Sequence, residues 1–152
     1  MKLEIPQAMK TEHDDLHSKL SRLTGAGGRT GEAAKAVAKI LHAHFVKENE
    51  YALPPLSLLV PLSQGAFDAG MAEVLKLTDK LAADMPVMLA EHQDVVAALR
   101  ELTDAATAEN KPEGAEFARM LTAHAQMEEE VTYPTALLIG LYVKNAIAHG
   151  AQ

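Results

Sequence analysis

The chain carries one short motif twice, and its residue types are those that bind transition metals. His44 and Glu48 lie in a segment that reads HxxxExExxxP, and the segment that contains His124 and Glu128 reads the same. Residues four apart on a helix are separated by only about 40° around its axis and about 6 Å along it, so they share one face. Each segment is therefore predicted to direct one imidazole and one carboxylate to a metal ion.

A second repeated motif precedes each of these segments. His13 lies in a pattern that reads EHxD, followed by an aliphatic residue and then by Leu four positions later, and His92 lies in the same pattern. His44 follows His13 by 31 residues, and His124 follows His92 by 32. Each half of the chain is therefore predicted to form one helical hairpin. Two facing hairpins would bring four His and two Glu to the middle of a bundle.

The elements that position these residues are predicted to be helices. The composition is rich in Ala, Leu, Met and Glu and only 4% aromatic, which favours helices over strands. Apolar residues recur at helical spacing between clusters of Gly and Pro. The predicted helices cover about residues 6–23, 31–52, 71–107 and 112–131, with a short packed connector at 56–64 and a terminal helix at 135–148.

Two prolines affect the predicted boundaries. Pro86 is predicted either to kink or to split the third helix, and Pro134 is predicted to end the fourth. We therefore predict an all-α fold, an antiparallel up-down four-helix bundle with an extra C-terminal helix. The chain, 1–152, is predicted to be a single domain, with a metal-binding bundle at about 6–134 and the terminal helix at about 135–149.

The composition also narrows the choice of partners and compartment. The absence of Cys excludes thiolate ligands and disulfides. The net charge is −7 and the basic residues are scattered, so we expect no nucleic-acid partner. No secretory signal and no membrane-spanning segment is recognisable, so we expect a cytoplasmic protein without a membrane partner. The apolar terminal helix is expected to offer a surface for a homodimer.

The order H…HxxxE…H…HxxxE, with Pro closing the second and fourth predicted helices, resembles the hemerythrin-like, or HHE cation-binding, domain family. The resemblance extends from His13 to Pro134 and includes the apolar tail. It implies a four-helix bundle that binds two Fe ions in a non-haem diiron centre, oxo- or hydroxo-bridged when oxidised. The metal ligands that it implies are four terminal imidazoles and two bridging carboxylates: His13, His44, His92, His124, Glu48 and Glu128.

The resemblance implies a protein that binds or reacts with a small diatomic or peroxide (O2, H2O2 or NO). Oxygen-carrying hemerythrins have a second His four residues from the third-helix His, whereas Met88 and Val96 flank His92 at that distance. In their fourth helix the carboxylate ligand follows its His by five residues. The repeat in this chain favours Glu128, which follows His124 by four residues, over Glu129, which follows it by five. A poor reversible oxygen carrier is therefore predicted, and enzyme activity stays open. The alternatives are iron storage, delivery or iron-centre repair, and a metal-free helical interaction module.

Several neighbouring residues lie at spacings that suit supporting roles. His17 lies one helical turn after His13, and Tyr51 lies three residues after Glu48. Either side chain could therefore complete the coordination. Tyr133 lies five residues after Glu128 and is predicted to point away. Glu12 and Glu91 are predicted to hydrogen-bond an imidazole on a neighbouring helix rather than their own adjacent His.

Overall fold

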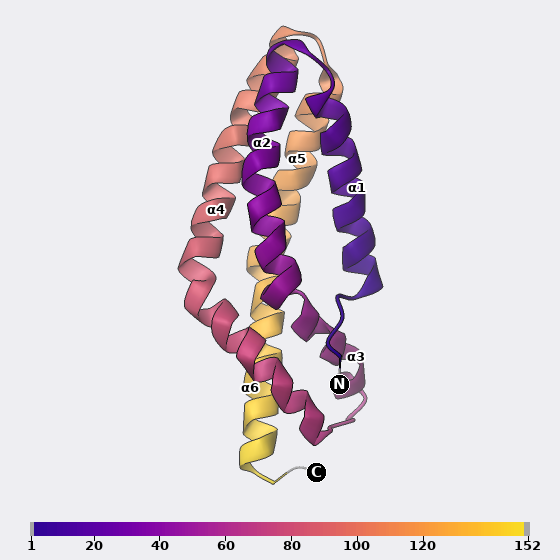
Figure 1. Cartoon of the computed structure of the whole chain (residues 1–152), viewed down its shortest axis with the longest axis vertical. Coiled ribbons are helices and arrows are strands. Elements are labelled where there is room, and N and C mark those ends of the chain that lie inside the picture. The colour runs from indigo at the N-terminus through magenta and orange to yellow at the C-terminus, as the bar shows by residue number, and fades with distance from the viewer. Residues whose placement is uncertain (1, 151–152) are drawn as a thin grey trace.

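All regular structure is helical in the computed structural model, which describes residues 2–150 (Figure 1). This confirms the predicted all-α class. The long helices are α1 (Gln7–Thr24), α2 (Gly28–Lys47), α4 (Val74–Ala108), α5 (Pro112–Met127) and α6 (Tyr133–Ala148). The shorter elements are the π-helices η1 (Glu48–Ala52) and η4 (Glu128–Thr132), the 3₁₀-helices η2 (Pro54–Leu58) and η3 (Ala69–Glu73), and α3 (Leu59–Ser63).

Two tight turns lie at the same end of the molecule (Figure 1). One joins α1 to α2 and uses Gly27 and Gly28 at φ 72° and 60°, and the other joins α4 to α5 through Asn110 at φ 54°. The turns are tied together by Glu109, whose carboxylate accepts hydrogen bonds from the Thr30 N–H at 2.7 Å and the Thr30 hydroxyl at 2.6 Å. No side chain of α2 caps the first turn of this helix. The Glu109 carboxylate instead accepts hydrogen bonds from backbone N–H groups there.

The connection from α2 to α4 lies at the opposite end and is built from η1, η2, α3 and η3. The predicted connector at 56–64 is thus itself helical. Of the two outcomes predicted for Pro86, the split is wrong. α4 is 35 residues long and contains Pro86 without a break. The helix changes direction partway along its length (Figure 1), as expected where Pro removes one backbone donor.

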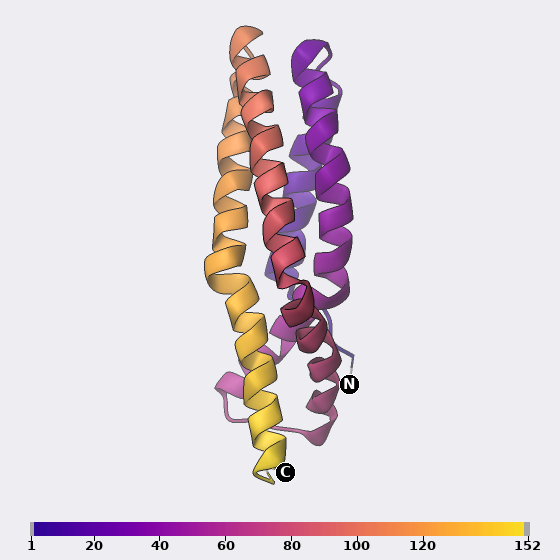
Figure 2. The same cartoon turned by 90° about the vertical axis from the view of Figure 1, so that its left-hand side faces the viewer.

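The predicted end of the fourth helix near Pro134 is wrong. α5 passes through η4 directly into α6, and Figure 2 shows one continuous helical path to the C-terminal end. The Tyr133 N–H bonds to the Glu128 carbonyl five residues earlier, which defines the π turn. Pro134 then falls in the first turn of α6, where a missing N–H costs little. The terminal helix is therefore an extension of the fourth.

The buried apolar side chains form two separate clusters. The first joins α1, α2, the second half of α4, and α5, and it includes Leu20, Leu41 and Leu102. The second joins η1, η2, the first half of α4, and α6, and it includes Leu81 and Ile139. Each fully buried side chain of this size stabilises the fold by about 1.5–3 kcal/mol.

α6 packs closely on the first half of α4. A Cβ atom added at Gly140 would lie 2.3 Å from Thr78 Oγ1 and 2.7 Å from Thr78 Cβ, so only Gly fits there without movement. This contact fixes the terminal segment against the second apolar cluster. No helix among residues 2–150 has both the length and the hydropathy needed to cross a membrane.

Candidate metal centre

The six residues predicted as ligands are all buried, and they lie between the two apolar clusters. Their exposed fractions range from 0% for Glu48 to 7% for His124. Each comes from a different element: His13 from α1, His44 from α2, Glu48 from η1, His92 from α4, His124 from α5 and Glu128 from η4. Six titratable side chains in a buried layer require partners that offset their desolvation.

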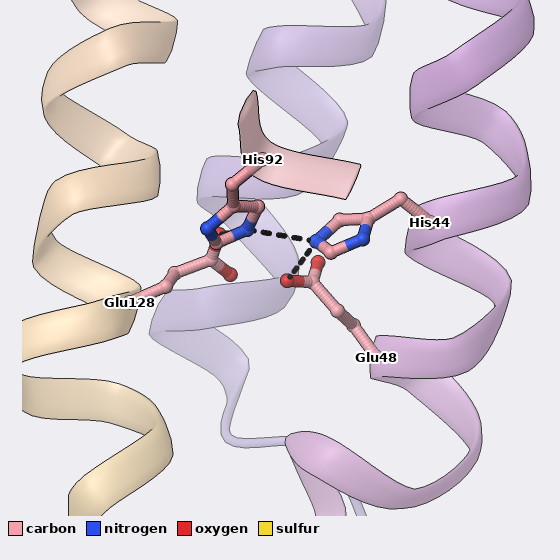
Figure 3. A group of neighbouring side chains, drawn as sticks. All are labelled: His44, Glu48, His92 and Glu128. Atoms are coloured by element: carbon pink, nitrogen blue, oxygen red, sulfur yellow. Dashed lines mark hydrogen bonds and ion pairs between the residues drawn. The ribbon is translucent and has the colours of Figure 1, made fainter. Parts of the chain in front are cut away.

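The first group of ligand atoms is formed by His44, Glu48, His92 and Glu128, which point toward one another in Figure 3. His44 Nε2 lies 2.9 Å from His92 Nε2 and 3.1 Å from Glu48 Oε1. His92 Nε2 lies 3.4 Å from Glu128 Oε1. One atom from each of the four residues lies within 4.8 Å of the others, which is close enough for a single metal ion to contact them all.

The second group is formed by His13, His124 and Glu128, whose ligand atoms also lie within 4.8 Å of one another. His124 Nε2 lies 3.4 Å from Glu128 Oε2, and His13 Nε2 lies 3.9 Å from the same oxygen. Glu48 reaches this group too, because its Oε2 is 3.5 Å from His13 Nε2.

Each carboxylate therefore spans both groups. Glu48 directs Oε1 toward His44 and Oε2 toward His13, and Glu128 directs Oε1 toward His92 and Oε2 toward His124. Two carboxylates that each place one oxygen in each of two neighbouring sites have the arrangement of bridges between two metals.

Three buried atoms of this layer make no hydrogen bond: Glu48 Oε2, Glu128 Oε2 and His124 Nε2. A buried polar atom without a partner costs about 1–3 kcal/mol. All three face the space shared by the second group, where a cation would satisfy them together. The residues present thus fit a pair of metal ions bound by nitrogen and oxygen.

Both HxxxE motifs lead into a π turn that starts at the Glu. The Leu53 N–H bonds to the Glu48 carbonyl at 2.9 Å, which matches the Tyr133 bond to Glu128 in the second half. Each π turn is followed by the Pro of the repeat, which has no N–H for an α-helical bond to the residue four before it. π turns inside helices are frequent at functional sites. The repeated Pro is the feature of the sequence that marks these turns, although α-helical periodicity predicts only a helix end there.

Three of the imidazoles are oriented from outside the centre by a carboxylate on a neighbouring element. The Nδ1···O distances are 2.9 Å for His44–Glu91, 2.9 Å for His92–Glu129 and 2.8 Å for His124–Glu12. The predicted hydrogen bonds of Glu12 and Glu91 to helices other than their own are confirmed. The sequence indicates Glu129 only as a substitute ligand and does not predict this supporting position. Such bonds hold the proton on Nδ1 and leave Nε2 free for a metal.

Glu91 belongs to a short charged chain. Lys47 donates to one of its oxygens, and His44 contacts the other at 2.9 Å. Burial opposes ionisation of Glu91, but the hydrogen bonds from Lys47 and His44 outweigh it and lower the pKa of this carboxyl. Burial likewise opposes protonation of His44, yet its hydrogen bond to Glu48 and the charge of Glu48 raise the imidazole pKa.

The two central carboxylates differ in their affinity for protons. Burial and the nearby charge of Glu128 raise the pKa of Glu48. Burial acts on Glu128 too, but hydrogen bonds from three imidazoles outweigh it and lower its pKa well below the usual value. Burial opposes protonation of His124, whereas its hydrogen bond to Glu128 raises the pKa to about 9. Without metal, protons therefore supply the positive charge that this layer needs.

The tyrosine at the centre is Tyr133, not Tyr51. The Tyr51 hydroxyl contacts Met88 Sδ at 3.6 Å within the second apolar cluster. Tyr133 donates to Glu48 and lies 3.1 Å from His44 Nε2. A π turn contains one more residue than an α turn, so a residue five positions after Glu128 returns to the inward face.

His17 does not join the centre. Its side chain is exposed, and its ring meets the Phe45 ring edge-on with centroids 4.9 Å apart. The same Phe45 ring stacks on His13 at 4.2 Å. His17 is therefore on the outer side of the aromatic contact that covers His13.

No protein-family model matches this chain, and neither a curated protein nor a solved structure matches it. The functional argument therefore depends on the geometry and chemistry of the site.

Proposed function

We propose that this chain is a hemerythrin-like non-haem diiron protein whose metals bind or react with a small diatomic or peroxide. The observation that carries the proposal is that Glu48 and Glu128 each direct one oxygen to each of two imidazole pairs. In this proposal α1, α2, α4 and α5 form an antiparallel up-down bundle, and α6 is its terminal extension. The proposal includes the cytoplasmic location expected from the sequence.

The donor set favours iron. Imidazole and carboxylate ligands suit iron, whereas the hard, all-oxygen sites of Mg²⁺ and Ca²⁺ do not use imidazole. Paired carboxylates and His inside a helical bundle are the recurring ligand set of di-iron and di-manganese carboxylate proteins. When bound, two irons would supply a redox-active pair of Lewis acids. His13 and His124 would hold one metal, His44 and His92 the other, and both carboxylates would contact each.

A surface groove borders the first ligand group. Its volume is about 440 Å³, it lies between α4 and α5, and its lining includes His92, Arg100 and Glu129. His92 is only 3% exposed, so the groove reaches the outer edge of the centre at this ligand. The alternative of a metal-free interaction module leaves the three unpaired buried atoms without an explanation.

Metal analysis of purified protein tests the proposal. We expect about two irons per chain, and we expect Glu128→Ala to lose most of both, because its carboxylate contacts both groups. Glu130→Ala is the matched control, since Glu130 is exposed and lies one half-turn away. A Glu128→Ala protein that keeps its full metal content, or wild-type protein that takes up no transition metal, would refute the proposal.

Cycling the diferrous protein between dioxygen and vacuum separates binding from reaction. We expect irreversible oxidation, in agreement with the poor reversible oxygen carrier predicted from the sequence. Recovery of colourless diferrous protein over many cycles would instead identify a reversible carrier. Loss of iron during the same cycles would favour a storage or delivery role.

A further inference from the structure

Tyr133 makes the two halves of the centre unequal. The residue that precedes the repeated Pro is Leu53 in the first half and Tyr133 in the second. Tyr133 is 1% exposed, and its ring stacks on that of His92 with centroids 5.6 Å apart. Its hydroxyl is directed into the first ligand group, and the second group contains no tyrosine.

The hydroxyl occupies a position at which a ligand atom would lie. Tyr133 Oη is 3.1 Å from His44 Nε2 and 3.2 Å from His92 Nε2, and the two nitrogens are 2.9 Å apart. Donor atoms bound at right angles to one metal, each about 2.1 Å from it, are about 3.0 Å from one another. The triangle formed by the three atoms therefore matches one face of a metal's coordination octahedron.

Three donor atoms converge in this triangle. The Nδ1 atoms of His44 and His92 face Glu91 and Glu129, so both Nε2 atoms are directed inward, toward Tyr133 Oη. The proton of Tyr133 is directed to Glu48, which leaves a lone pair of the phenol oxygen for another partner. A cation at the centre of these atoms would contact all three.

We propose that the Tyr133 oxygen is a ligand of the iron held by His44 and His92; this inference rests on the proposed function. On binding ferric iron the phenol would form an O–Fe bond and release its proton to solvent, as protonated ligands do when they bind metals. Tyrosine oxygen is an established type of iron ligand. This metal then has five protein ligands, since both carboxylates also contact it.

The other metal has only four protein ligands, which are His13, His124 and the two shared carboxylates. The second metal therefore keeps more positions for a small exogenous anion than the first, beside the stacked His13 and Phe45 rings. The symmetry of the repeat alone would give both metals the same number of protein ligands. Tyr133 breaks that symmetry.

Visible absorption and resonance Raman spectra of the air-oxidised protein test the inference. Phenolate bound to ferric iron gives a visible charge-transfer band, and excitation in that band enhances tyrosine ring vibrations. We expect both signals in the wild type, and their loss in Tyr133→Phe with two irons retained. Tyr51→Phe is the matched control, since Tyr51 is equally buried but contacts Met88.

The outcomes separate the two proposals. Wild-type protein that lacks iron refutes the proposed diiron function. Wild-type protein that holds two irons but shows no enhanced tyrosine vibrations refutes the role of Tyr133, even if Tyr133→Phe fails to fold. The same conclusion follows if the band persists in Tyr133→Phe or is lost equally in Tyr51→Phe.

Discussion

Glu91→Gln should weaken metal binding more than the same change at the other two supporting carboxylates. Glutamine keeps the size of the side chain but not its charge, and one of its two terminal atoms is an NH2 group. Glu91 accepts from Lys47 with one oxygen and from His44 with the other. Because an NH2 group cannot accept, the variant must give up one of these two partners.

The expected loss of metal affinity depends on how exposed each supporting carboxylate is to solvent. Losing a carboxylate that supports a metal-bound imidazole typically weakens metal affinity about 10- to 100-fold, or about 1.4–2.8 kcal/mol. The Glu91 side chain is 18% exposed, whereas Glu129 and Glu12 are 40% and 45% exposed, and solvent screening weakens exposed ion pairs. We expect about 100-fold for Glu91→Gln and about 10-fold or less for Glu12→Gln.

The assay is a competition between the metal-free protein and a chromophoric chelator for ferrous iron under anaerobic conditions. Circular dichroism of each variant provides the control for folding. If Glu12→Gln weakens binding as much as Glu91→Gln, the link between burial of the supporting carboxylate and metal affinity is wrong.

Three further predictions concern stability. Removing the metals with a chelator should lower the free energy of unfolding by at least about 3 kcal/mol, because three buried atoms each lose a partner worth about 1–3 kcal/mol; an unchanged melting temperature would contradict this. Gly140→Ala should cost about 1–3 kcal/mol in urea unfolding by overpacking against Thr78, whereas Gly25→Ala, at φ −86°, should be close to neutral. Hydrogen bonds from Thr30 lower the pKa of Glu109 to about 2, so this carboxylate stabilises the fold above about pH 4.5 and loses that effect as the pH falls toward 2. The melting temperatures of wild type and Glu109→Gln should therefore differ at pH 7 and converge in acid.

The sequence was sufficient to bring the six predicted ligands together. The helical period places each His and Glu of an HxxxE motif on one face, and the nearly equal spacing of the two halves, 31 and 32 residues, sets their depth along the bundle. His13 and His92, with no carboxylate four residues after them, were identified only through the repeated EHxD pattern. The hydrogen bonds of Glu12 and Glu91 followed from the same geometry, since residues adjacent on a helix cannot face each other.

The π turns account for most of what the sequence did not reveal. A fixed α-helical period places Tyr133 far around the axis from Glu128, and it gives Pro134 the role of a helix terminator. One additional residue in the turn reverses both conclusions, because it rotates Tyr133 inward and moves Pro134 into the first turn of α6. A periodicity argument cannot detect such a local change. The only sign of the π turn in the sequence is that Pro follows the ligand Glu by six residues in both halves.

The ligand groups cross between the two halves of the chain, and this has a consequence for folding. The first group pairs His44 with His92, and the second pairs His13 with His124, so each group takes one imidazole from each hairpin. Neither hairpin alone contains a complete site for either metal. Each metal would therefore hold the two hairpins together, at a level where the apolar core is interrupted by a polar layer. Because the unfolded chain has no preformed site, the free energy of metal binding contributes to folding.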